Sequence, residues 1–178
     1  MELKTKLTVK ELYEIYPPES RVELINGEVY EMPAPTTSHQ RVLFRIAKRL
    51  DEAKGKGEVL IAPVDVMLSE DILLQPDLVL VLDTTKVKDR VEGVPDLVVE
   101  VVSPSSLKRD VVDKFRLYEK YGVKEYWLVF PAEKSLLIFT LTDKGYELFS
   151  EAHEKGRVKS KLIEGFELEV SEVFQEAS

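Results

Sequence analysis

The feature that most constrains the fold of this chain is a glutamate inside an apolar run. The stretch "PDLVVEVV", residues 95–102, resembles the middle of a buried strand, yet it contains Asp96 and Glu100. Side chains two residues apart in a strand share a face, so Glu100 points the same way as Val98 and Val102. An ionised carboxylate is costly to bury unless it is paired or binds a cation. The sequence therefore predicts a metal ion or a Lys or Arg beside Glu100, unless its strand is only half buried.

A second stretch, "QPDLVLVL" at 75–82, repeats the Pro-Asp-apolar pattern. Asp77 stands at the beginning of this apolar run. It is either a turn residue after Pro76, a position where Asp is common, or a second acid that enters the same interior. In the second case Asp77 and Glu100 converge from neighbouring strands.

The length and composition of the chain suit one folded domain over residues 1–178. Hydrophobic residues make up 44% and charged residues 33% of the 178 residues, which is a balance typical of globular proteins. The chain has no cysteine, and this excludes disulfides, thiol catalysis and thiolate metal sites. We therefore expect a single domain with oxygen and nitrogen ligands only.

Hydropathy and net charge restrict the partners of the protein. The N-terminal stretch has no apolar signal region, and no later segment reaches the length of a membrane helix, so we expect a cytoplasmic protein without a membrane partner. The formal net charge of −8 opposes non-specific binding to nucleic acid, because such binding depends on neutralising phosphates. A nucleic-acid-binding role therefore requires a local basic patch or a divalent cation.

Local signals predict helices and strands in the first half of the chain. Thr8 and Glu11 form a capping-box pattern for a helix over 8–16, and Asn26-Gly27 between two strand-like runs predicts a hairpin. A longer helix is expected over 38–55, with Ser38 as its cap and Gly55 at its end. Its predicted buried stripe consists of Val42, Leu43, Ile46 and Leu50.

The second half of the chain alternates strands with one further helix. We expect a helix over 107–121, closed by Gly122, and strands at 58–68, 76–82, 95–102, 124–131, 135–142 and 146–151. This order predicts an α/β (α+β) fold in which a central mixed sheet is flanked by helices and preceded by an N-terminal β-hairpin.

The predicted helix over 107–121 carries a lysine within its apolar stripe. The stripe consists of Val111, Lys114, Phe115, Tyr118 and Tyr121. Lys114 either extends along the apolar face to reach solvent, pairs with Asp110 one turn earlier, or reaches Glu100. The last interpretation follows from the chain order, because the helix comes directly after the strand of Glu100 and must pack back on the sheet.

His39 and Glu23 are weaker candidates for functional residues. His39 lies at the N-terminal end of the stripe of the 38–55 helix, where a boundary histidine with satisfied hydrogen bonds is the alternative. Glu23 alternates with Val22 and Leu24, so an exposed strand glutamate is its default interpretation.

Two converging carboxylates and a lysine suit a site for a hard divalent cation. Mg²⁺ and Mn²⁺ prefer carboxylate oxygens, retain bound water and recruit phosphate groups. The cation polarises a phosphoryl oxygen and lowers the pKa of bound water, while a lysine orients that water or stabilises developing charge. The pattern therefore indicates metal-assisted hydrolysis of a phosphodiester.

At these residues the sequence resembles a known family. The stretch "QPDLVLVL…VPDLVVEVVSPSSLKRDVVDKFRLYEKYGVKEYWLVFP" resembles the restriction-endonuclease-like PD-(D/E)XK superfamily. It is most similar to a bacterial, cyanobacterial-type family of predicted endonucleases, and the resemblance runs from "VELINGEVYEMPAPTTSHQ" to about residue 131.

The resemblance assigns roles to particular residues. It implies that Asp77 is the PD aspartate and Glu100 the acid of (D/E)XK, both as ligands of Mg²⁺ or Mn²⁺. The lysine expected two residues after Glu100 is absent, because position 102 is Val102. The resemblance implies that the lysine has migrated to the following helix in this subfamily, which would make Lys114 its replacement, and that Glu23 and His39 also match family positions.

Three classes of function compete at this point. The first is a Mg²⁺-dependent endonuclease acting on nucleic acid, with DNA expected, and the second is a module that keeps the nuclease fold without turnover. A two-carboxylate glycosidase is the third, but it gives Lys114 no role. A basic cluster could contact phosphates unless it is simply a solvated helix face: Lys108, Arg109, Lys114, Arg116, Lys120 and Lys124. A homodimer is left open.

Overall fold

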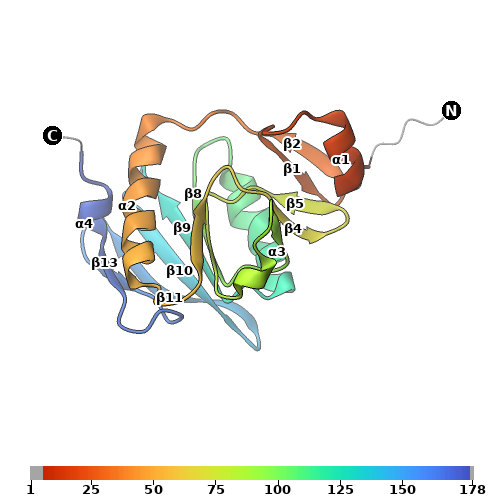
Figure 1. The fold of residues 1–178 in the computed structure, drawn as a ribbon. Helices are drawn as coiled ribbons and strands as arrows, with labels where there is room; N and C mark the ends of the chain where they lie inside the picture. The colour runs from red at the N-terminus through yellow and green to blue at the C-terminus, as the bar shows by residue number, and fades with distance from the viewer. Residues whose placement is uncertain (1–5, 177–178) are drawn as a thin grey trace.

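The computed structural model describes residues 6–176, which form two β-sheets and a small C-terminal hairpin with helices around them (Figure 1). The helical elements are α1 (Val9–Ile15), α2 (Thr37–Ala53), η1 (Thr84–Lys86), η2 (Arg109–Asp113), α3 (Lys114–Tyr121) and α4 (Val170–Val173). Between residues 6 and 176, no helix combines the length and the apolar character that crossing a membrane requires.

The large sheet has six strands in the order β11-β10-β9-β8-β6-β3. The strands are β3 (Glu58–Ile61), β6 (Leu78–Val81), β8 (Leu97–Val101), β9 (Glu125–Phe130), β10 (Ser135–Thr142) and β11 (Gly145–His153). Only β8 and β9 are parallel, and η2 and α3 connect them. The sheet is therefore mixed, as the sequence predicts, and the two proposed acid-bearing strands, β6 and β8, are neighbours within it.

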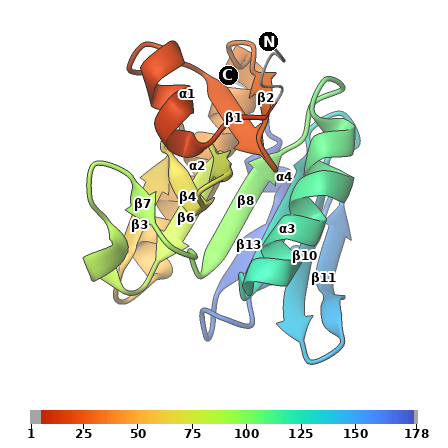
Figure 2. The same cartoon turned by 90° about the vertical axis from the view of Figure 1, so that its right-hand side faces the viewer.

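The second sheet has five short strands in the order β2-β1-β5-β4-β7. These are β1 (Val22–Ile25), β2 (Glu28–Glu31), β4 (Val66–Ser69), β5 (Ile72–Leu74) and β7 (Val91–Glu92), and a separate hairpin joins β12 (Arg157–Lys159) to β13 (Glu167–Glu169). Figure 2 shows this small sheet, which carries α1, beside α3. The small sheet and α3 together cover one side of the large sheet.

Alternating side chains of the large sheet contribute to two separate cores. One face packs Leu97, Val99 and Val101 against α2 and the C-terminal segment. The other face packs Val98 and Val102 against α3 and the small sheet. Glu100 shares this second face, so its carboxylate enters the layer between the large sheet and α3.

Several predicted elements are confirmed. The capping box of Thr8 and Glu11 begins α1, and Asn26 and Gly27 both adopt positive φ in the turn between β1 and β2. The four stripe residues of α2 are buried. Gly122, at φ 86°, ends α3.

Two predicted details are wrong. The predicted strand over 58–68 is two strands, because β3 pairs with β6 in the large sheet whereas β4 pairs with β5 in the small one. Pro63 lies between them and has no N–H group to continue a ladder. The cap of α2 is Thr36 rather than Ser38, since the Thr36 hydroxyl accepts a hydrogen bond from the His39 N–H at 3.2 Å.

Two glycines with similar backbone angles provide a test of close packing at β3. Gly57 has φ +88°, and a Cβ there would lie 2.6 Å from the Val81 carbonyl oxygen at the end of β6. Gly122 has φ +86° and open space around it. We expect Gly122→Ala to lower the free energy of unfolding by about 1 kcal/mol, because only the left-handed backbone opposes alanine.

Gly57→Ala should lose about 1–3 kcal/mol more, because the backbone of β6 must also shift. Denaturant titration of both variants measures the difference. If both variants lose the same free energy of unfolding, β3 is free to move away from β6.

Candidate active site

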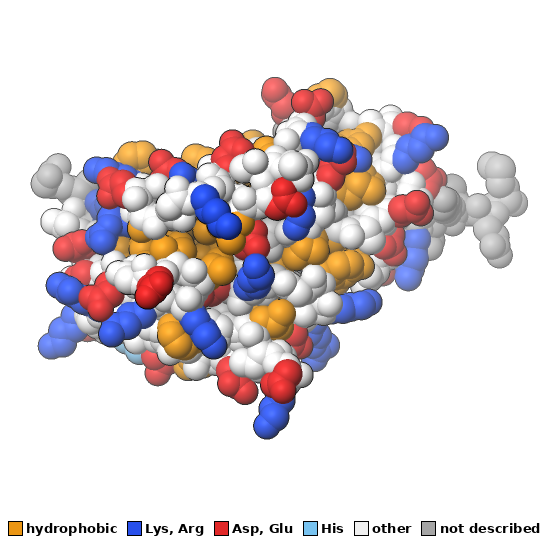
Figure 3. Space-filling model, turned by 60° about the horizontal axis from the view of Figure 1, so that its bottom comes forward, with side chains coloured by type: hydrophobic (Ala, Val, Ile, Leu, Met, Phe, Trp, Pro, Cys, Tyr) orange, Lys and Arg blue, Asp and Glu red, His pale blue; other side chains and the backbone are white. Residues whose placement is uncertain are grey.

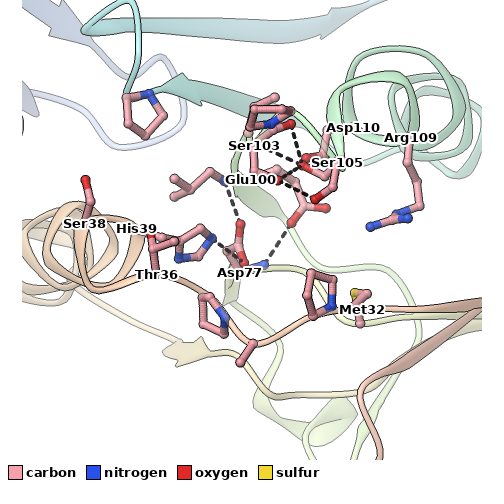
Figure 4. Close-up of a pocket in the computed structure, with 18 of the residues that line it drawn as sticks. Met32, Thr36, Ser38, His39, Asp77, Glu100, Ser103, Ser105, Arg109 and Asp110 are labelled. Carbon is pink, nitrogen blue, oxygen red and sulfur yellow. Dashed lines mark hydrogen bonds and ion pairs between the residues drawn. The ribbon is translucent and has the colours of Figure 1, made fainter.

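Asp77 and Glu100 lie side by side at the ends of two central strands. β6 and β8 are antiparallel, with Leu78 opposite Val99, and this register places Asp77 next to Glu100. The Asp77 N–H donates to Glu100 Oε1 at 2.9 Å, and the Val101 N–H donates to Asp77 Oδ2 at 2.6 Å. Each carboxylate is thus held by the backbone of the other strand (Figure 4).

Lys114 bridges carboxylates from two other elements. Its Nζ lies 2.6 Å from Glu100 Oε2 and 2.6 Å from Glu23 Oε2. Asp110 Oδ1 is more distant, at 3.9 Å. The predicted contact between Lys114 and Glu100 is therefore confirmed, and the alternative pairing with Asp110 is the longest of the three.

Glu23 is completely buried, so its default interpretation as an exposed strand residue is wrong. Its Oε1 lies 3.1 Å from Arg109 Nε, and its Oε2 accepts a hydrogen bond from the Gln75 N–H at 2.8 Å. The reason is tertiary, because the small sheet turns this face of β1 toward α3 instead of toward water. Glu23 therefore contacts Lys114 as a second close carboxylate besides Glu100.

His39 contacts the metal-ligand candidate Asp77 from α2. Its Nε2 lies 3.3 Å from Asp77 Oδ1, and its side chain is largely buried, with 16% exposed. The capping bond from Thr36 fixes the first turn of α2, which carries His39. His39 thus orients Asp77 in this arrangement.

The charged groups in this cluster do not balance. It combines more carboxylates than fixed cations: Glu23, Asp77, Glu100 and Asp110 against Arg109 and Lys114. Burial raises the pKa of Glu100 well above its usual range, and the neighbouring carboxylates add to this effect while Lys114 opposes it. Burial also raises the pKa of Asp110, to about 6. When its carboxyl groups are ionised, the site therefore carries negative charge that Arg109 and Lys114 do not neutralise.

Lys114 is held in its protonated form. Burial alone lowers the pKa of its ammonium, but Glu100 and Glu23 outweigh burial and raise this pKa well above its usual range. At neutral pH Lys114 is consequently a fixed positive charge. It cannot accept a proton from a water molecule.

The cluster opens into a cavity of about 490 Å³. The segments that line it are 32–36, 38–39, 75, 77, 100–106, 109–110, 114 and 131–132, together with residue 21. Figure 4 shows Asp77 and Glu100 between His39 on one side and Ser103 and Ser105 on the other. A molecule in this cavity thus reaches Asp77, Glu100 and Lys114, whereas Glu23 does not line it.

The donor atoms of this cavity fit a hard divalent cation. Asp77 and Glu100 offer carboxylate oxygens, and Mg²⁺ commonly binds through one or two carboxylates while retaining water. Within residues 6–176, no group of three or more His, Cys, Asp or Glu side chains is arranged to hold a metal. A cation here would therefore use two carboxylates, with water or substrate oxygens as its other ligands, and the unneutralised charge of the cluster favours it.

The predicted basic cluster does not form one surface. Arg109 and Lys114 turn into the buried cluster, Lys108 is exposed and lies 3.6 Å from Asp113, and Lys124 pairs with Asp96 at 3.2 Å. Arg116 and Lys120 are exposed on the outer side of α3. On the face shown in Figure 3, acidic and basic side chains are likewise intermixed.

Asp96 does not line the cavity, and its carboxylate contacts a backbone N–H group and a lysine instead. Its Oδ2 accepts a hydrogen bond from the Leu82 N–H at 2.8 Å, and its Oδ1 contacts Lys124. Asp96 therefore links the beginning of β8 to the end of β6. The two acids of "PDLVVEVV" thus belong to opposite ends of one strand.

Arg109 is a site residue that helical spacing missed. An α-helical stripe through Lys114 excludes position 109, but η2 is a π-helical turn in which the Lys114 N–H donates to the Arg109 carbonyl. The wider turn brings residues five apart toward the same side. Had the burial of Glu23 been predicted, it would have indicated a second cation besides Lys114, because the buried glutamate contacts both Lys114 and Arg109.

Substituting Glu23 and Glu100 in turn tests which of the two buried carboxylates holds Lys114 and Arg109 in place. Glu23→Gln should lower the free energy of unfolding in EDTA by roughly 3 kcal/mol, because Arg109 loses its only ion-pair partner within residues 6–176 and Lys114 loses one of two close partners. Glu100→Gln should cost much less, because it keeps an acceptor for the Asp77 N–H, leaves Lys114 paired with Glu23 and reduces the excess negative charge. Thermal or denaturant unfolding measures both variants. A larger loss for Glu100→Gln would show that Glu100, rather than Glu23, anchors the lysine.

Comparison with known proteins places this geometry in a family. Residues 9–171 match the model of the Uma2 family, which is described as "Putative restriction endonuclease". No curated protein matches the chain. Among solved structures, the chain is similar to a "putative nuclease belonging to DUF820 from Anabaena variabilis ATCC 29413", with 16% sequence identity and a TM-score of 0.79.

That structural likeness covers 94% of this chain and 97% of the Anabaena variabilis chain, and it confirms the restriction-endonuclease-like fold. The family match covers α1, both sheets, the acid-bearing strands and the helix of Lys114. The predicted family resemblance is confirmed as well. The chain belongs to the Uma2 family.

Proposed function

We propose that this protein is a nuclease that requires Mg²⁺ or Mn²⁺ and hydrolyses phosphodiester bonds of nucleic acid, with DNA as the expected substrate. The observation that carries the proposal is the contact of 2.6 Å between Lys114 Nζ and Glu100, beside Asp77 in an open cavity. Membership of a family described as "Putative restriction endonuclease" supports a nuclease. The donor set supports the choice of metal.

In this proposal each residue has a separate task. A divalent cation at Asp77 and Glu100 would supply Lewis acidity and lower the pKa of a bound water. Lys114, which is permanently charged, stabilises negative charge on the attacking oxygen or on the phosphoryl group and does not act as a base. Glu23 positions Lys114, and His39 positions Asp77.

Lys114 lies on a helix, whereas the superfamily pattern places the lysine on the strand, two residues after the acid. Val102 occupies the position of the usual lysine and is buried against α3 in the second core. Lys114 reaches the same acid from the opposite direction, from the first turn of α3. A lysine on the helix can therefore serve the acid of the strand, provided that the helix packs on this face.

A binding module without turnover is the second candidate. Its support is that the four oxygens of Asp77 and Glu100 already have protein contacts, from the N–H groups of Asp77 and Val101, from Lys114 and from His39. A carboxylate oxygen has two lone pairs, so these contacts leave room for a cation. Cleavage assays separate the two candidates.

The proposed function predicts metal-dependent cleavage that depends on Glu100 and Lys114. Supercoiled, linear, single-stranded and branched DNA and a structured RNA are each incubated with ~10 mM Mg²⁺ or Mn²⁺, about ten times the Kd of a weak site. Wild type should cleave at least one substrate, EDTA should abolish cleavage, and Glu100→Gln and Lys114→Gln should each reduce the rate by at least roughly a hundredfold.

Glu164→Gln, an exposed acid outside the cavity, serves as the control and should retain full activity. Cleavage that survives EDTA or the Glu100→Gln substitution would refute the proposal. A wild type that binds nucleic acid but cleaves none of the panel would favour the binding module.

Metal should also stabilise the folded protein, because the paired carboxylates form a site only in the native state. For a Kd of about 1 mM, ~10 mM Mg²⁺ adds about 1.4 kcal/mol, which corresponds to a rise in Tm of roughly 3–5 °C. Asp77→Asn should reduce this rise strongly and Glu164→Gln should not, when Tm is measured at constant ionic strength. Equal shifts in both variants would mean that the cation acts on the net charge of the whole surface.

A further inference from the structure

Two arginines line the cavity and have guanidinium nitrogens that make no hydrogen bond or ion pair within residues 6–176, although the Arg109 guanidinium also lies 5.9 Å from the centre of the Tyr30 ring. Arg109 approaches Glu23 through Nε alone, at 3.1 Å, and its two terminal nitrogens make no hydrogen bond or ion pair within residues 6–176. Arg21 has no ion pair with any residue in that range, and its Nε is buried without a hydrogen-bond partner. The cavity therefore contains unsatisfied donors as well as acids.

The fold places both arginines on one side of β1. Arg21 directly precedes β1, and its carbonyl accepts a hydrogen bond from the Met32 N–H at 2.9 Å, which continues the ladder with β2. Arg21 and Glu23 are two residues apart and so share a face. Because Glu23 contacts Arg109, Arg21 and Arg109 lie on the same side of β1, and both line the cavity.

Two arginines of α2 have a structural role that Arg21 and Arg109 lack. Arg45 donates to the Val173 carbonyl at 3.0 Å, and Arg49 donates to the Glu167 carbonyl at 3.1 Å. These contacts fasten α2 to the C-terminal segment. Arg21 and Arg109 have no comparable structural partner for their free nitrogens, although a planar guanidinium is well suited to bind a phosphate through two parallel hydrogen bonds.

We propose that Arg21 and Arg109 bind a second phosphate group, that of the nucleotide next to the bond that is cleaved. This inference rests on the proposed nuclease function and extends it, because it makes the substrate a nucleic-acid strand with at least two phosphates. The cleaved phosphate meets Asp77, Glu100 and Lys114, and the neighbouring phosphate meets the two arginines along the same cavity. The arginines also offset the negative charge of the carboxylates, which would otherwise repel a strand.

Arg21→Gln is the informative variant, because Arg21 takes no part in the ion pairs of Lys114. Arg109→Gln also removes a partner of Glu23, so it can change turnover indirectly. Arg116→Gln is the matched control, because Arg116 is exposed on α3 and does not line the cavity.

Binding is measured by fluorescence anisotropy with a single-stranded thymidine hexanucleotide labelled at its 3′ end. All variants are made in the Glu100→Gln background, which removes cleavage. Arg21→Gln should raise Kd roughly tenfold to a hundredfold. It should also reduce the slope of log Kd against log salt by about 0.7, the value for one phosphate contact on a single strand. Arg21→Lys should recover part of the affinity, and Arg116→Gln should change neither quantity.

The hexanucleotide is tested with and without a 5′-phosphate to identify the source of the phosphate. An effect of Arg21→Gln on both forms indicates an internal phosphate, and an effect on the phosphorylated form alone indicates a terminal one. Equal Kd values and salt slopes for Arg21→Gln and Arg116→Gln would overturn the inference.

Kinetics distinguish failure of this inference from failure of the proposed function. In the protein that retains Glu100 and can cleave, Arg21→Gln should raise KM by the same factor as it raises Kd in the binding assay. It should leave kcat nearly unchanged. Cleavage by wild type with no specific effect of Arg21→Gln would retain the nuclease and refute the second phosphate site. Binding that depends on Arg21, without cleavage by wild type, would retain the phosphate site and refute the nuclease.

Discussion

The ion pairs of Lys114 with Glu23 and Glu100 are the interaction on which the rest of this structure depends. They join the N-terminal hairpin to the strand β8 and the helix α3, which follow much later in the sequence. A buried charge is tolerated only when its partners are held in place. The small sheet must therefore close over α3, and this closure creates one wall of the cavity.

The position of this cluster between two hydrophobic cores gives it rigidity. β8 contributes valines to both cores, so the backbone of Glu100 is fixed from two sides. Two hydrogen bonds, from the Asp77 N–H to the Glu100 carboxylate and from the Val101 N–H to the Asp77 carboxylate, then fix the second acid relative to the first. The two carboxylates are consequently preorganised before any ligand arrives, which is a requirement for efficient electrostatic catalysis.

The balance of charge within the cluster connects the site to its proposed ligands. Arg109 and Lys114 neutralise only part of the buried carboxylates, and burial, with a smaller contribution from the neighbouring carboxylates, raises the pKa values of Glu100 and Asp110. A divalent cation would neutralise the remaining charge, and the cation together with Arg21 and Arg109 would turn an acidic cavity into one that accepts phosphates. A protein with a net charge of −8 can in this way engage nucleic acid locally, without a broad basic surface.

The sequence by itself determined the mixed fold, the hairpin and the helices that became α2 and α3, and it gave the approach of Lys114 to Glu100 as one of three possibilities, which the structure then selected. These follow from local rules: the Asn-Gly turn, the apolar periodicities and the cost of leaving Glu100 unpaired. The tertiary structure alone decided the burial of Glu23 and the participation of Arg109, because both depend on a second sheet that closes over α3 and on a π-helical turn that shifts helical spacing. It also decided that the basic residues of α3 separate into buried and exposed groups, since a sequence gives the spacing of charges along a helix but not which side the helix packs.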